Sequence, residues 1–186
     1  MKLIFFGGVQ GVGKTTLLSW LKNQHGEQIK FLNPGELFRR YFYNERIKTI
    51  EEIEELIVAE LEESPADSII AMHWHYAVRR PSGYIPQISF PRLRKIAEGR
   101  KIDQVILFLV EAPADIIRER RLSDQKVKKR ELSKSVIDGE IEAEEEFWNT
   151  HKVLFSSILG NDKVISLRLV NIDLYTAKIQ LFDSVL

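Results

Sequence analysis

The sequence predicts an α/β fold, a five-stranded parallel sheet with helices on both faces. Three observations predict it. Short apolar segments with β-branched residues alternate with segments of helical periodicity, each is bounded by polar, glycine or proline residues, and the first leads through a glycine-rich turn into a helix. Strands that alternate with helices form parallel sheets covered on both faces. The expected strands are Lys2 to Phe6, Ile29 to Leu32, Ser68 to Met72, Gln104 to Val110 and Lys163 to Leu169.

The segments between the strands carry the helical periodicity. Thr49 and Glu52 fit a capping box, in which each side chain bonds the backbone N–H of the other residue. Pro113 suits a first helical position, and Asp115 suits the positive end of the helix dipole. The segment from Arg79 to Pro91 is rich in proline, so we expect a loop there. The expected helices are Lys14 to Gln24, Gly35 to Tyr43, Thr49 to Glu62, Pro91 to Glu98, Pro113 to Leu122 and Ser135 to Leu159.

Length and composition predict a single globular domain over residues 1–186. The chain has 44% hydrophobic and 29% charged residues, as ordinary globular proteins do. Basic and acidic residues both number 27, so no global basic field attracts nucleic acid or anionic membrane. The longest apolar run, Val105 to Val110, is far shorter than a membrane span. The absence of cysteine excludes disulfides and zinc-thiolate sites and favours a cytoplasmic protein.

The turn after the first strand matches the Walker A pattern. Its residues are Gly8, Val9, Gln10, Gly11, Val12, Gly13, Lys14, Thr15 and Thr16. In this P-loop, glycines let backbone N–H groups face phosphate oxygens, and the following helix points its positive end at the same anion. Lys14 is expected at the β and γ phosphates of ATP, and the Thr15 hydroxyl at Mg²⁺. The alternative is a glycine-rich turn without a ligand.

Further segments resemble an archaeal-type adenylate kinase, a P-loop nucleoside monophosphate kinase. Besides the P-loop, they are Asn33 to Arg39, Met72 to His75 with Arg79 to Pro86, and Glu119 to Leu122 with Lys129-Arg130, in that family's order. The resemblance implies a three-layer α/β/α P-loop fold, a monophosphate-binding flap over about residues 35–62 and a lid over about residues 119–135. It also implies transfer of a phosphoryl group from ATP to AMP, and it leaves a homo-oligomer open, since relatives of this type are often oligomeric.

The resemblance assigns residues to the acceptor nucleotide. Arg39 matches the arginine that grips the monophosphate, Arg79 matches one at the acceptor phosphate, and Glu36 and His75 are the other substrate-binding candidates. Guanidinium groups suit this task because they hold two phosphate oxygens at once. Arg40 lies about 100° from Arg39 around a helix, so we expect only one of them, Arg39, in the cleft. The alternative for Arg39 and Arg79 is solvated surface arginines.

A basic group follows in the expected lid. Arg121 and Arg130 are assigned to ATP phosphates, with Arg120 as the alternate, and Lys14, Arg39, Arg79 and Arg121 form the expected catalytic set. A lid of this kind excludes water when it closes. The alternative is cationic residues that favour a helix C-terminus. Aromatic residues are not interleaved with these charges, which argues against a nucleic-acid patch.

The sequence departs from the family pattern at the end of the third strand. The family has an Asp-Gly-His pattern there, whose aspartate organises Mg²⁺ through water, and this chain has His73-Trp74-His75. Two histidines two residues apart on a strand share a face, so a metal pair is conceivable, but no third ligand is evident. More in keeping with the family, His75 lies near the nucleotides and Trp74 packs or stacks. Glu111 is a candidate carboxylate near the phosphates, or a strand-end cap.

Two functions remain open at this stage. The first is a nucleoside monophosphate kinase that uses ATP and Mg²⁺, with AMP as the expected acceptor. The second is a nucleotide-binding protein or slow ATPase that keeps the kinase fold without an efficient acceptor site. The missing strand-end aspartate motivates the second, and the basic lid and Arg79 favour the first.

Overall fold

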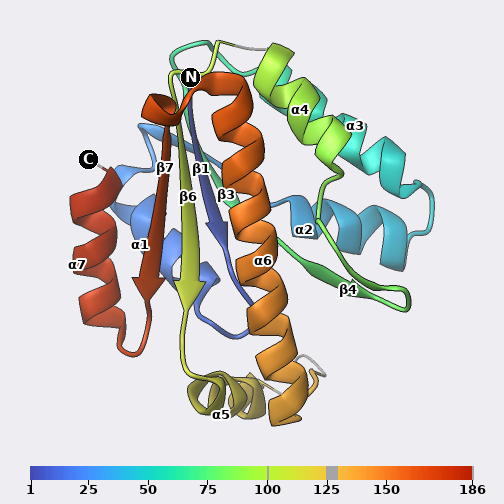
Figure 1. Cartoon of the computed structure of the whole chain (residues 1–186), viewed down its shortest axis with the longest axis vertical. Helices are drawn as coiled ribbons and strands as arrows, with labels where there is room; N and C mark the ends of the chain where they lie inside the picture. The colour runs from blue at the N-terminus through green and yellow to red at the C-terminus, as the bar shows by residue number, and fades with distance from the viewer. Residues whose placement is uncertain (100, 125–129, 186) are drawn as a thin grey trace.

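The computed structural model describes residues 1–99, 101–124 and 130–185. Its centre is a five-stranded parallel sheet with the strand order β2-β3-β1-β6-β7 (Figure 1). The strands are β1 (Lys2–Gly7), β2 (Ile29–Leu32), β3 (Ile69–His73), β6 (Gln104–Glu111) and β7 (Val164–Val170). The predicted α/β fold is confirmed, and every strand starts and stops within one residue of its expected bounds.

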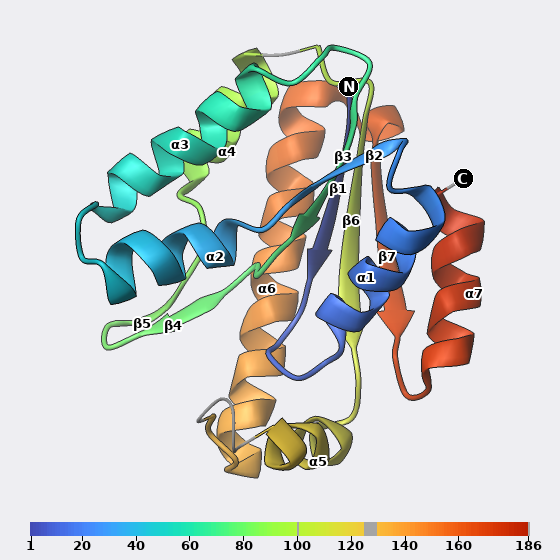
Figure 2. The ribbon, with the colours of Figure 1, turned by 180° about the vertical axis from the view of Figure 1, so that it is seen from behind.

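Helices cover both faces of the sheet. One face carries α1 (Lys14–His25) and α7 (Leu174–Val185); Figure 2 shows α1 in front of the strands and α7 beside β7. The other carries α3 (Ile50–Glu62), α4 (Phe90–Gly99) and the long α6 (Lys134–Leu159), which crosses the sheet in Figure 1. Helix α5 (Ala114–Asp124) lies at the carboxyl end of β6. None of the described helices combines the length and apolar character that a membrane crossing needs.

The central strand β1 divides the core into two halves. Leu3 and Phe5 point to the α3, α4 and α6 side, whereas Ile4 and Phe6 point to the α1 and α7 side, and all four are buried. This alternation follows from the two-residue period of a strand. Because both faces are apolar, β1 is fixed in the middle of the sheet, and the P-loop that follows it emerges at the middle of the sheet's carboxyl edge.

Two short strands replace part of the expected proline-rich loop. β4 (Val78–Arg80) and β5 (Gly83–Ile85) form an antiparallel hairpin in which Val78 pairs with Ile85. The prediction of a loop is wrong here because Pro81 lies in the turn and Pro86 after the hairpin, so neither removes a donor from the paired residues. Gly83 has a φ of 120°, which suits glycine at this turn.

The flap is also built differently from the expected single helix over Gly35 to Tyr43. Helix α2 (Pro34–Leu37) passes into a π-helical segment, η1 (Phe38–Asn44), which ends where the Glu45 N–H donates to the Arg40 carbonyl at 2.9 Å. π-Helical turns are rare and occur often at functional sites. Beyond the flap, the capping box of α3 is confirmed, since Thr49 N–H donates to Glu52 Oε2 (2.7 Å) and Glu52 N–H to Thr49 Oγ1 (3.2 Å).

A buried histidine in α6 links folding stability to pH. His151 is 0% exposed, its Nδ1 donates to the Phe147 carbonyl at 2.7 Å, and its ring meets Trp74, Tyr76 and Phe90 edge to face. Burial lowers the pKa of His151 to about 4. The folded state therefore stays unprotonated at a pH where the unfolded chain, with a histidine pKa of about 6.5, already binds a proton.

We predict that the free energy of unfolding falls as the pH drops from about 6.5 to about 4, with His151 contributing up to about 3 kcal/mol. Above pH 6.5 His151 is neutral in both the folded and the unfolded state, so it does not change the free energy of unfolding with pH. Urea unfolding of the native chain and His151→Leu at several pH values tests this. The difference in stability between the two proteins should change across this window; parallel profiles would contradict the assignment.

Candidate functional site

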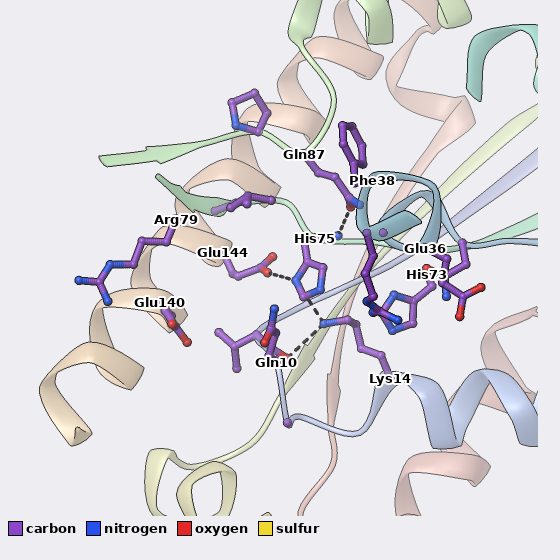
Figure 3. Close-up of a pocket in the computed structure, with 18 of the residues that line it drawn as sticks. Gln10, Lys14, Glu36, Phe38, His73, His75, Arg79, Gln87, Glu140 and Glu144 are labelled. Carbon is purple, nitrogen blue, oxygen red and sulfur yellow. Dashed lines mark hydrogen bonds and ion pairs between the residues drawn. The ribbon is translucent and has the colours of Figure 1, made fainter. Parts of the chain in front are cut away.

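The described residues enclose a cavity of about 1480 Å³ at the carboxyl edge of the sheet. Ligand pockets of about 300–1,000 Å³ are typical, so this cavity exceeds the space that one small ligand needs. One end is lined by the P-loop, and the other by the flap and the β4–β5 hairpin, with α6 along one side (Figure 3). Ligands of open α/β folds bind at this edge.

The P-loop has the backbone conformation that its glycines predict. Gly8, Gly11 and Gly13 have φ values of 135°, 90° and 100°. A Cβ atom at Gly8 would lie 2.3 Å from the Val110 carbonyl oxygen, and one at Gly13 would lie 2.2 Å from Asn171 Nδ2. Glycine is therefore required at both positions for the loop to lie against its neighbours. Of the nine expected P-loop residues, the cavity is lined by Val9, Gln10, Gly11, Gly13, Lys14, Thr15 and Thr16, whereas Gly8 and Val12 lie behind it.

Lys14 lies at the P-loop end of the cavity. Its side chain is 4% exposed, and its ammonium group donates to the Gly8 carbonyl and, at 3.1 Å, to the Val9 carbonyl (Figure 3). Burial lowers the pKa of Lys14 to about 8, opposed by the nearby Glu144. The lysine is thus a buried cation held by two carbonyl groups of its own loop.

The partly buried His75 and the buried Glu144 form a pair beside Lys14. Nδ1 of His75 donates to Glu144 Oε1 at 3.0 Å, and the Tyr76 N–H donates to Glu144 Oε2 at 2.7 Å (Figure 3). The His75 N–H donates to Gln87 Oε1 at 2.7 Å. Because Nδ1 carries the proton, Nε2 remains as the acceptor. Burial and the charge of Lys14 lower the pKa of His75, so the ring is neutral at pH 7.

Glu144 and Gln87 were not among the sequence candidates. Glu144 comes from the middle of α6, about seventy residues after His75, and it is 3% exposed. A buried carboxylate on the apolar side of a helix is unusual, since charged residues are rarely fully buried unless they are paired. That was the signal available in the sequence, where Glu144 occupies a core-facing position of the long helix between Ile137 and Trp148.

His73 reaches the start of α1. It ends β3, pairs in register with Phe6 of β1, and its Nε2 lies 3.4 Å from Thr15 Oγ1. Burial, then the charge of Lys14, lowers the pKa of His73 to about 3. Trp74, between the two histidines, is 1% exposed and packs edge to face on Phe5, so it packs in the core. Among the described residues, no group of three or more metal-ligating side chains gathers.

The flap end of the cavity contains Glu36, Arg39 and Arg79, three of the acceptor-site candidates. Arg39 also lies close enough to His73 to influence its charge. Arg40 does not line the cavity; its side chain pairs with Glu45 at 2.9 Å and lies over the Tyr41 ring. The two adjacent arginines therefore point in different directions, as their spacing predicts.

A second buried carboxylate, Glu54, was missed by the sequence analysis and lies at the same end. It is 5% exposed and accepts hydrogen bonds from Ser89 N–H and Ser89 Oγ, both at 2.7 Å, with Arg92 Nε 3.9 Å away. Glu54 comes from α3 and Ser89 from the segment before α4. This contact joins α3 to the segment before α4 at the wall of the cavity.

The basic residues of the expected lid are placed unequally. Arg120 and Arg130 line the cavity, but Arg121 does not. Arg121 is 1% exposed and donates to the Gln10 carbonyl at 2.9 Å, to the Glu131 carbonyl at 2.9 Å and to Glu140 Oε2 at 2.5 Å. Its guanidinium is engaged beneath the P-loop, which differs from the expected phosphate contact. Lys126, Lys128 and Lys129 lie outside the described residues.

Arg120 also supports the P-loop from outside. It donates to the Val12 carbonyl at 3.1 Å and to the Asn171 carbonyl at 2.9 Å, while Asn171 Nδ2 donates to the Val12 carbonyl at 2.7 Å. Asn171 follows β7 and was not a sequence candidate. Glu111 does not line the cavity; its carboxylate pairs with Arg168 at 2.6 Å. The lining of the cavity therefore gives no support to Glu111 as a carboxylate near the phosphates.

Comparison with known proteins matches the part of the chain that contains the P-loop. A family model described as an AAA domain matches residues 7–138, which include the P-loop, the flap and the hairpin. The adenylate kinase of Saccharolobus solfataricus is 26% identical over 160 residues, which cover 76% of this chain and 79% of that protein. The resemblance to an archaeal-type adenylate kinase, inferred from the sequence, is confirmed.

The different environments of Arg121 and Arg130 give a testable contrast. Arg121→Ala removes a buried guanidinium group together with its three partly buried hydrogen bonds, so we predict a loss of about 2–4 kcal/mol in the free energy of unfolding. Arg130→Ala, at the cavity wall, should cost less than about 1 kcal/mol, since its ion pair with Asp124 is partly exposed. Chemical denaturation of both variants measures this; equal losses of stability would contradict the placement of Arg121.

Proposed function

Because the chain belongs to the AAA domain family, whose model matches residues 7–138, we propose that it is a nucleoside monophosphate kinase that transfers a phosphoryl group from ATP to AMP. The similarity to an adenylate kinase supports a nucleotide kinase as the broad class. Four finer expectations stay predictions: AMP as the acceptor, Mg²⁺ as the metal, a cytoplasmic location and a homo-oligomer.

The observation that carries this proposal is the arrangement of one cavity with two cationic ends. Lys14 and Arg120 lie at the P-loop end, and Arg39 and Arg79 at the flap end. A protein that only binds or hydrolyses ATP needs the first end alone. A cavity of about 1480 Å³ with arginines at both ends suits two nucleotides whose phosphates meet between them.

The proposed reaction needs positioning and cations rather than a covalent intermediate. The P-loop N–H groups and the N-terminus of α1 bind the ATP phosphates, and phosphate oxygens replace the Gly8 and Val9 carbonyls as partners of Lys14. An oxygen of the acceptor phosphate, oriented by Arg39 and Arg79, attacks the γ-phosphorus. The bond from that phosphorus to the β–γ bridging oxygen breaks, which leaves two nucleoside diphosphates.

A divalent cation enters such a reaction with ATP and neutralises charge on the β and γ phosphates. Thr15 suits one ligand position, because it is the second residue of α1 and follows Lys14 directly. The second protein group nearby is the imidazole of His73, where the family carries a carboxylate. Thr15 and His73 therefore fit a divalent cation. The imidazole of His73 influences which metal ion the site prefers.

The histidine at position 73, where the family carries an aspartate, favours a second function. A nucleotide-binding protein or slow ATPase would keep the P-loop and lose efficient transfer, and His73 in place of the strand-end aspartate motivates this reading. The two functions differ in their dependence on an acceptor. A kinase consumes ATP only with a nucleoside monophosphate present, so ATP consumption that is equal with and without AMP, CMP, GMP and UMP, each tested with Mg²⁺ and with Mn²⁺, would exclude the kinase.

The acceptor site is tested by the neighbouring arginines of the flap. We predict that Arg39→Ala raises the KM for AMP by about 10- to 100-fold, because a charge-assisted phosphate contact contributes about 1.5–3 kcal/mol. The affinity for ATP, measured by calorimetry, should stay within about twofold.

Arg40→Ala is the matched control, since Arg40 pairs with Glu45 away from the cavity. Its KM for AMP should be close to that of the native chain. If Arg39→Ala weakened ATP binding as much as AMP binding, or if Arg40→Ala had the larger effect on AMP, the flap would not hold the acceptor as proposed.

A further inference from the structure

The end of strand β3 brings an imidazole to the start of α1. His73 pairs in register with Phe6, so its position is fixed by two central strands immediately before the P-loop. Thr15, the second residue of α1, lies opposite, and its hydroxyl is the P-loop's own ligand for a nucleotide-bound cation. His73 and Thr15 thus face the same point from two rigid elements.

The separation of these two groups suits a shared metal better than a hydrogen bond. His73 Nε2 and Thr15 Oγ1 are 3.4 Å apart, at the long limit for a hydrogen bond. Two neighbouring ligands on an octahedral divalent cation, with bonds of about 2.1 Å, are separated by about 3 Å. A small cation between them would need little movement of either side chain.

Three carboxylates of the cavity lining are already engaged, so they do not replace the strand-end aspartate; Glu36, Glu51 and Asp124 also line the cavity. Glu144 bonds His75 and Tyr76, Glu140 bonds Arg121, and Glu54 bonds Ser89. Lys14 and Arg39 also lie near His73, and their charges oppose the entry of a free cation. A metal therefore reaches His73 only when phosphates accompany it and supply its remaining ligands, which agrees with the lack of a three-residue metal cluster in the described ranges.

We propose that His73 is a direct nitrogen ligand of the cation that enters with the nucleotide, and that the site favours a transition-metal ion such as Mn²⁺ or Co²⁺ over Mg²⁺. Imidazole nitrogen is a good ligand for first-row transition metals, whereas Mg²⁺ takes oxygen ligands and dehydrates reluctantly. The inference rests on the nucleotide-binding part of the proposed function and leaves the identity of the acceptor aside.

Pulsed electron paramagnetic resonance of the Mn²⁺–ADP complex tests the direct bond. The full chain is prepared with natural-abundance and with ¹⁵N-labelled histidine, so that couplings from histidine are separated from those of the adenine ring. We expect a directly coordinated histidine nitrogen in the native chain. It should disappear in His73→Ala and His73→Asp and persist in His75→Ala, the matched control two residues away. Without ADP, Mn²⁺ should show no histidine coupling.

The metal preference is measured by calorimetric titration of ADP in the presence of Co²⁺ or of Mg²⁺. We expect the ratio of the two affinities to shift towards Mg²⁺ by about tenfold or more in His73→Asp, which restores an oxygen ligand. A hydrogen bond from a metal-bound water to His73 would leave the ratio unchanged and give no direct coupling, and that result would overturn the proposal. The proposal would also be overturned if ADP bound to the native chain neither with Co²⁺ nor with Mg²⁺.

These measurements are separate from the kinase assay. Histidine coupling in the Mn²⁺–ADP complex supports the proposal even if no monophosphate is phosphorylated, in which case the kinase function fails and the metal ligand stands. Conversely, acceptor-dependent transfer without any histidine coupling would leave the kinase intact and overturn the role of His73.

Discussion

The buried ammonium group of Lys14 is the constraint around which the site is arranged. A cation in this position needs partners, and the P-loop supplies them as the carbonyls of Gly8 and Val9. Those carbonyls can face inward only because the glycines adopt positive φ angles that leave no room for a Cβ atom. The loop is in turn fixed from behind by Arg120 and Asn171, both bonded to the Val12 carbonyl. The result is a pre-formed loop with a buried cation, which is the arrangement that the proposed binding of nucleotide phosphates needs.

The cavity is assembled from segments that are far apart in the chain. β1 brings the P-loop, β3 brings His73 and His75, and α6 crosses one face of the sheet to place Glu144 beside them (Figure 1). The flap and the β4–β5 hairpin close the other end and carry Arg39 and Arg79. The P-loop and β3 lie at the centre of the sheet and place Lys14 and the two histidines, whereas Arg39 and Arg79 lie on the smaller flap and hairpin at its edge.

The sequence predicted what depends on local patterns. Strand bounds followed from short apolar runs, and the P-loop followed from the spacing of Gly8, Gly13 and Lys14. Tertiary packing decided the rest. Periodicity could not show that Glu144 contacts His75, which is about seventy residues away in the sequence. It also could not show that Arg121 lies beneath the P-loop while its neighbour Arg120 lines the cavity. The hairpin was missed because three-residue strands between prolines resemble a loop. Helix α7 was missed because exposed residues such as Tyr175 and Ile179 blur its apolar stripe.

The account depends on Lys14 lying between two nucleotides in one continuous cavity. Calorimetric titration with a bisubstrate analogue, two adenosines joined through five phosphates, measures this directly. One molecule should bind per chain, about 100-fold more tightly than ADP, because a single ligand spans both cationic ends. Two analogue molecules bound per chain, or an affinity no better than that of ADP, would contradict a shared site for donor and acceptor.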